Sequence, residues 1–76
     1  MFVQTMIQKA KRAGYETKLH VGKKVRLITK GGDYIMPING EVRDVYLKRA
    51  KKPPVKVNTE VFLANFKAAI ERAKGK

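Results

Sequence analysis

Cysteine is absent from the sequence, so the chain can form neither a disulfide scaffold nor a metal site built from thiolates. Histidine occurs once, at His20, which also excludes a zinc site built from several histidines. No apolar run approaches the ~20 residues of a membrane-spanning helix, and the amino terminus turns from mildly apolar to basic, the reverse of a signal peptide. We therefore expect a cytoplasmic protein that holds no metal and no other cofactor.

Acidic residues are scarce as well, since 6 Asp and Glu stand against 18 Lys and Arg, a formal net charge of +12 in 76 residues. Repulsion on this scale lowers the stability of a folded chain, which favours a polyanionic partner that relieves it. The short length predicts one small domain, residues 1–76. Nucleic acid is the first partner we expect and an acidic protein surface the second. A membrane surface is not expected, because neither predicted helix joins a strong apolar face to a lysine-rich one.

Two amphipathic helices are predicted, one near each end of the chain. The first covers residues 2–13 and should end at Gly14, and the second begins after a cap formed by Asn58 or Thr59. The residues on their apolar faces are Val3, Met6, Ile7, Ala10 and Ala13 in the first helix and Phe62, Phe66, Ala69, Ile70 and Ala73 in the second. Each helix therefore has one side to bury against a common core.

Residues 15–38 alternate apolar and polar with a period of two, which is typical of half-buried strands. A three-residue loop at residues 22–24 would pair Leu19 with Leu27 and keep Val21 on the apolar face. A two-residue loop would set apolar against charged residues, so burial favours the longer loop.

The second hairpin is predicted from a glycine pair. A two-residue turn at residues 31 and 32 would pair Leu27 with Met36, again apolar against apolar. Pro37 has no N–H to donate to a neighbouring strand, which predicts that the third strand lies at an edge of the sheet.

These elements predict an α+β fold, a two-layer α-β-β-β-α sandwich in which two helices cover one face of a three-stranded antiparallel sheet. The covered face would carry Leu19, Val21, Val25, Leu27, Met36 and Ile38, and the open face Lys18, His20, Arg26 and Lys30. Ile28 would lie opposite Ile35 on the open face. Two exposed isoleucines side by side would mark a contact surface, in a homodimer or with another partner.

The segment at about residues 41–58 fits no single secondary-structure pattern. Residues 45–47 are apolar and suit either a short strand or a helical turn under the core. From Val45 to Thr59 no residue is acidic, while five are basic and surround the stiff Pro53-Pro54 pair. We expect this basic arm to contact phosphates.

The predicted nucleic-acid-binding residues belong to the open face, the first hairpin loop and the basic arm. They are Lys18, His20, Lys23, Lys24, Arg26, Lys30, Lys48, Arg49, Lys51, Lys52 and Lys56. Their role would be recognition of the backbone and its shape rather than of bases, because phosphate contacts carry no sequence information directly.

Several short motifs follow one another along the chain. They are Ala13-Gly14-Tyr15 at the end of the first predicted helix, Gly22 before the second strand, Gly31-Gly32 in the second turn and the stretch Ile35-Met36-Pro37-Ile38-Asn39-Gly40. With the closing amphipathic helix they cover most of the chain, and in them it resembles the HicA-type toxins, small mRNA interferases. The resemblance implies a double-stranded-RNA-binding-like α-β-β-β-α fold and RNA as the nucleic acid.

The sequence departs from that family at its catalytic motif. The family has Gly-Ser-His at the start of the second strand, with a catalytic histidine, whereas Gly22, Lys23 and Lys24 stand here. Histidine is the residue type that suits acid–base chemistry near neutral pH, and His20 is the only one, so a ribonuclease would use His20 as base and Lys24 or Arg26 to stabilise phosphate charge. The six carboxylates are scattered and none is paired with it in the sequence.

Three functions are thus expected in descending order. The first is a nucleic-acid-binding module, with RNA slightly before DNA. The second is a small inhibitor or regulator, of the kind carried by phages and mobile elements, that docks its basic face on an acidic protein. The third is a ribonuclease with an altered site around His20.

Overall fold

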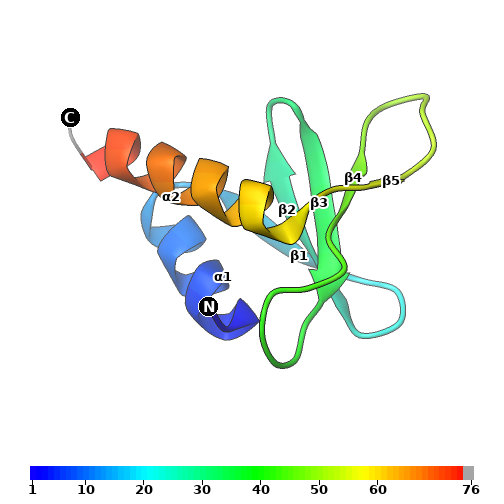
Figure 1. Cartoon of the computed structure of the whole chain (residues 1–76), viewed down its shortest axis with the longest axis horizontal. Coiled ribbons are helices and arrows are strands. Elements are labelled where there is room, and N and C mark those ends of the chain that lie inside the picture. The colour runs from blue at the N-terminus through cyan, green and yellow to red at the C-terminus, as the bar shows by residue number, and fades with distance from the viewer. Residues whose placement is uncertain (75–76) are drawn as a thin grey trace.

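Within residues 1–74, which a computed structural model describes, the chain forms two helices and one antiparallel sheet of five strands (Figure 1). The elements follow in the order α1 (Val3–Arg12), β1 (Glu16–His20), β2 (Lys24–Thr29), β3 (Gly32–Pro37), β4 (Tyr46–Lys48), β5 (Val55–Lys56) and α2 (Thr59–Lys74). Both helices lie on one face of the sheet and leave the other face open. The α+β class with two helices on one antiparallel sheet is confirmed, whereas the predicted number of strands is wrong.

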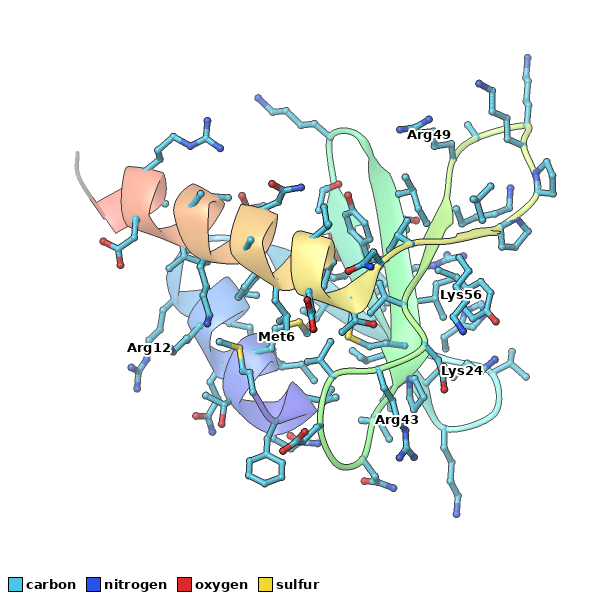
Figure 2. The ribbon with its side chains drawn as sticks, viewed as in Figure 1. Met6, Arg12, Lys24, Arg43, Arg49 and Lys56 are labelled. Carbon is cyan, nitrogen blue, oxygen red and sulfur yellow. The ribbon has the colours of Figure 1, made fainter. Side chains whose placement is uncertain are left out.

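Helix α1 forms as the sequence predicts. Val3, Met6 and Ala10 are completely buried in the common core, and the labelled Met6 lies between α1 and α2 (Figure 2). The helix ends before Gly14, whose φ of 93° lies in the left-handed region that glycine adopts easily. There the Tyr15 N–H donates to the Ala10 carbonyl at 2.9 Å, which satisfies an acceptor at the helix end.

Helix α2 begins with a side-chain cap. Asn58 accepts a hydrogen bond at Oδ1 from the Val61 N–H at 3.1 Å, and Glu60 lies in the first turn. The buried residues are Phe62, Phe66 and Ile70, which pack against the same core as α1. Ala73 is exposed, so the predicted apolar face is one turn too long.

The registers of both predicted hairpins are wrong by two residues. In the first, Leu19 lies opposite Val25 rather than Leu27, because the loop is residues 21–23. In the second, Leu27 lies opposite Tyr34 rather than Met36, because the turn is residues 30 and 31. A shift of two keeps every side chain on its predicted face, so burial alone cannot distinguish the two registers.

Leu19 and Val21 were expected in the core and are exposed, with 79% and 84% of their surface accessible. Leu19 shares a pleat row with the buried Val25. The loop between β1 and β2 extends away from both helices, however, so nothing covers this end of the face (Figure 1). The alternating pattern therefore predicts the face correctly but not how far the helices reach over it.

The segment expected to be irregular adds two strands to the sheet. Strand β4 pairs with residues 33–35 of β3, and β5 pairs with β4. Strand β3 is therefore internal, and the expectation that Pro37 makes it an edge is wrong. Pro37 lies beyond the residues that β4 pairs with, so its missing N–H costs no hydrogen bond there. Val45, just before β4, is completely buried in the core.

The open face carries one row of side chains across all five strands, namely Lys18, Arg26, Ile35, Tyr46 and Lys56. Ile35 is only 8% exposed beside Tyr46, and Ile28 lies opposite Asp33. The exposed isoleucine pair is therefore not formed, because the register separates the two residues and Tyr46 of β4 lies beside Ile35.

Neither helix of the described residues is long and apolar enough to cross a membrane.

Candidate nucleic-acid interface

The predicted binding residues separate into two groups at opposite ends of the sheet. Lys30, Lys48, Arg49, Lys51 and Lys52 belong to the end with the β2–β3 turn and the β4–β5 loop, and His20, Lys23 and Lys24 to the end with the β1–β2 loop. Lys18, Arg26 and Lys56 lie in the row between them. Lys30 was expected on the open face and is part of the turn instead.

Carboxylates neutralise part of the open face. Lys18 Nζ lies 3.6 Å from Glu16 Oε1, Arg26 Nε 3.5 Å from Asp33 Oδ2, and Lys56 Nζ 3.5 Å from Asp44 Oδ1. All three pairs are at least partly exposed, and such pairs contribute little to stability and exchange readily for other partners. The strongest unneutralised charge is therefore at the ends of the sheet rather than across its centre.

A depression of about 520 Å³ lies between the β2–β3 turn and the beginning of the β4–β5 loop. We call it the basic depression, and its charged lining consists of Arg26, Lys30, Lys48, Arg49 and Asp33. Four cations, from β2, the β2–β3 turn, β4 and the start of the β4–β5 loop, thus surround a single carboxylate. The backbone of residues 31 and 32 completes the lining, so main-chain groups face the same space.

Arg49 is held at the rim of the basic depression by the turn. Its Nε donates to the Gly31 carbonyl at 3.3 Å, which leaves the two terminal amino groups of the guanidinium for another acceptor. β4 approaches the turn closely at Gly32, where an added Cβ would lie 2.9 Å from Leu47 Cδ1 and 3.1 Å from the Lys48 carbonyl oxygen. The glycine therefore permits the approach that brings Arg49 to the turn.

Lys48 has a structural role within the β4–β5 loop. Its ammonium donates to the Arg49 carbonyl at 2.9 Å and to the Lys52 carbonyl. The Lys52 N–H in turn donates to the Arg49 carbonyl at 3.2 Å, which closes a turn at this end of the loop. The loop is thus organised by its own basic residues, and Lys51 and Lys52 are exposed on it.

The residues at the other end of the sheet, around the β1–β2 loop, form a weaker candidate site. His20 lies opposite Lys24 and not Arg26, and its side chain makes no hydrogen bond or ion pair within the described residues. Lys24, Arg43 and Lys56 project from the open side of the sheet (Figure 2). Glu41 and Asp44 lie in the same connection as Arg43, so the positive charge there is diluted.

A further basic group, which we did not predict as a binding site, lies on the helical side. Lys9, Lys11 and Arg12 occupy the last turn of α1, where cations stabilise the helix dipole. Arg12 projects on the far side of the molecule from Arg49 (Figure 2). Variants of this group can therefore serve as controls for variants of the basic depression, because they remove similar charge at a distant part of the surface.

All four cations of the basic depression were predicted from the sequence as binding residues. That they converge, and that Arg49 donates to the Gly31 carbonyl, was not predicted. Both depend on the pairing of β4 with β3, and a three-residue strand has no periodicity that would predict it. Within residues 1–74, no three His, Asp or Glu side chains lie close enough to hold a metal ion. Comparisons with protein-family models, curated proteins and solved structures find no match to this chain.

Proposed function

We propose that the protein binds nucleic acid by its phosphate backbone, with the basic depression as the principal contact. The observation that carries this proposal is the convergence of Arg26, Lys30 and Arg49 from separate segments around one concave surface. Concave basic surfaces concentrate positive potential, and phosphates are the polyanion that such potential attracts. The formal net charge of +12 supports the same partner class.

Arg49 supplies the geometry that phosphate needs. Its guanidinium is fixed through Nε, so its terminal amino groups can donate in parallel to two phosphate oxygens. Lys30 adds a mobile point charge from the exposed turn, and Lys51 and Lys52 extend the charge along the loop. Contacts to phosphates carry no sequence information directly, so we expect binding with little sequence preference.

The resemblance to HicA-type toxins supports RNA before DNA. The order of one helix, three strands and a closing helix that this resemblance implies is contained in the observed order, with β4 and β5 inserted before α2. Relationship to that family stays a prediction. The ribonuclease hypothesis has less support, because no carboxylate of the described residues orients His20.

The proposal is tested by measuring the dissociation constant for RNA and DNA across a series of salt concentrations. About 4 to 6 phosphate contacts would give a log–log slope of roughly −4 to −5. Absence of binding at low salt would contradict the proposal and favour an acidic protein partner. Loss of intact RNA during the titration would instead support the ribonuclease hypothesis.

A matched pair of triple variants locates the site. Each removes two lysines and one arginine, so the change in net charge and in composition is the same. The site variant is Lys30→Gln, Arg49→Gln and Lys52→Gln, and the control is Lys9→Gln, Lys11→Gln and Arg12→Gln. We expect the site variant to weaken binding about tenfold and to flatten the salt slope by about 2 to 3, with a much smaller change in the control. Equal losses would show that binding follows net charge and not this surface.

A further inference from the structure

A second cavity, of about 270 Å³, lies between the sheet and α2, on the helical side of the β2–β3 turn. We call it the aromatic pocket, and the side chains that matter for its chemistry are Tyr15, Thr29, Tyr34, Phe62, Asn65 and Phe66. They come from the residue before β1, from β2 and β3 and from α2. The residues of the pocket are thus far apart in the sequence, and the tertiary fold brings them together.

Four of the nine residues that line this pocket are aromatic. Phe62 and Phe66 are buried, and the ring of Tyr34 lies 4.7 Å from that of Phe62, centre to centre, at an angle of 48°. Tyr15 and Tyr34 are half-buried, so each still presents part of its ring to the pocket. Ring-lined cavities of this kind hold flat apolar or heteroaromatic groups by stacking.

Polar groups also line the pocket. Asn65 is exposed on α2 and carries an amide that both donates and accepts hydrogen bonds. The hydroxyl of Thr29 donates to the Gly32 carbonyl, so toward a ligand it can only accept. A flat ring with donors and acceptors on its edge would therefore find both stacking surfaces and hydrogen-bond partners. Nucleobases have this chemistry, whereas an aliphatic side chain would leave the polar groups unused.

The aromatic pocket adjoins the basic depression. Thr29 and Gly31 line both cavities, so the two meet at the β2–β3 turn. A ligand that joins a flat ring to a phosphate would therefore contact both across the turn. This continuity connects the aromatic pocket with the cations already described.

We propose that the aromatic pocket takes an unpaired nucleobase from a nucleic-acid strand whose phosphates lie on the basic depression. This inference rests on the proposed function and makes it more specific, because it selects single-stranded nucleic acid. A base inside a duplex is stacked and paired, so its faces are not accessible to protein rings. Stacking on aromatic side chains tolerates every base, so this inference also predicts little sequence preference.

The first experiment compares three probes at one salt concentration. They are a short single-stranded oligonucleotide, the same strand with abasic residues, and the corresponding duplex. We expect the single strand to bind about 5- to 150-fold more tightly than the abasic strand, the range of one base stacked on protein rings. Because the chain has no tryptophan and Tyr15 and Tyr34 are two of its three tyrosines, the single strand should also quench tyrosine fluorescence.

Variants of α2 test whether the pocket is responsible. Ala69 lines the pocket, and Ala69→Leu would fill it with a residue that favours a helix. The control is Ala68→Leu, at an exposed neighbouring position. A second pair, Asn65→Asp with Gln8→Glu as control, changes an exposed position by one charge and does not depend on repacking. Ala69→Leu and Asn65→Asp should abolish the preference for the single strand, while both controls keep it.

The outcomes separate this inference from the proposed function. Equal affinity for the three probes, with a steep salt dependence, would overturn the base pocket and leave phosphate binding intact. Failure of all three probes to bind at low salt would overturn the proposed function itself. A single-strand preference that survives both Ala69→Leu and Asn65→Asp would show that the base is held elsewhere.

Discussion

At the scale of single residues, Gly32 fixes the relation between the β2–β3 turn and β4. Its φ of 133° is one that side chains rarely adopt, and an added Cβ would meet Leu47 Cδ1 at 2.9 Å. Gly31, one position earlier, has open space around the place of its Cβ. Two adjacent glycines thus differ completely in what they tolerate.

We expect Gly32→Ala to lower the free energy of unfolding by about 1 to 3 kcal/mol, because backbone strain and a contact with β4 combine. Gly31→Ala should change it by less than ~0.5 kcal/mol, since nothing opposes the added methyl group. Urea unfolding of both variants, followed by circular dichroism, measures the difference. Equal stability of the two would contradict the close approach of β4 at Gly32.

The sequence predicted that these glycines form a turn but not which residues occupy it. Turns at residues 31 and 32 or at residues 30 and 31 keep Leu27 and Met36 on the same face, so hydrophobic patterning cannot choose. The choice is made by β4, which approaches closely only where the strand residue lacks a side chain. That information is tertiary and is absent from the local sequence.

At the scale of elements, helix α2 depends on its amino-terminal cap. Asn58→Ala removes the acceptor for the Val61 N–H, and we expect a loss of about 1 kcal/mol in the free energy of unfolding. Asn58→Asp keeps an acceptor at the same place and should retain most of that stability. A thermal unfolding series of the two variants tests the cap, and an unchanged stability of Asn58→Ala would show that solvent replaces it.

The β1–β2 hairpin differs from the rest of the sheet in how little the helices cover it. We expect Leu19→Thr and Val21→Thr each to cost less than ~0.5 kcal/mol, because both side chains are exposed. Leu27→Ala, at a position only 1% exposed on the same face, should cost about 2 to 5 kcal/mol. Equilibrium unfolding measures all three. A large loss for Leu19→Thr would mean that another chain or segment covers this end.

Long elements were predictable and short ones were not. Residues 3–12 and 59–74 carry a helical period over several turns, and residues 16–37 carry the period of strands. Strands β4 and β5 span only three and two residues, too few for any period to be recognised. They are stabilised by the sheet that they join, so they depend on a neighbour that lies far away in the sequence.

At the scale of the whole molecule, the candidate interface follows from the topology. The net charge predicted a polyanionic partner, and the cations that line the basic depression were all predicted as binding residues. Their convergence arises because β4 runs antiparallel to β3 and so brings Arg49 back to the turn that follows β2. The aromatic pocket arises in the same way, from α2 lying over the end of β2 and β3.

Net charge predicts opposite effects of salt on folding and on binding. The formal charge of +12 repels itself over a screening length that falls from ~30 Å at 0.01 M salt to ~8 Å at 0.15 M, so the melting temperature of the free protein should rise with sodium chloride. The exposed ion pairs oppose this trend only weakly. Affinity for nucleic acid should fall over the same range. The release of counterions from the nucleic acid favours binding less as the salt concentration in solution rises.

The two triple variants separate these effects in one experiment. Both remove three positive charges, so at low salt the site variant should gain about 0.5 to 1 kcal/mol of stability, roughly 2 to 8 °C in melting temperature, and the gain should vanish at high salt. The control should gain less, because Lys9, Lys11 and Arg12 also stabilise the dipole of α1. Only the variant at Lys30, Arg49 and Lys52 should also lose affinity for nucleic acid, since Lys30 and Arg49 line the proposed contact and Lys52 lies on the adjoining loop. Calorimetry with and without a single-stranded oligonucleotide measures both quantities on the same samples. A melting temperature that falls with salt would show that the ion pairs outweigh the repulsion, and the polyanion would then no longer be needed to explain the charge.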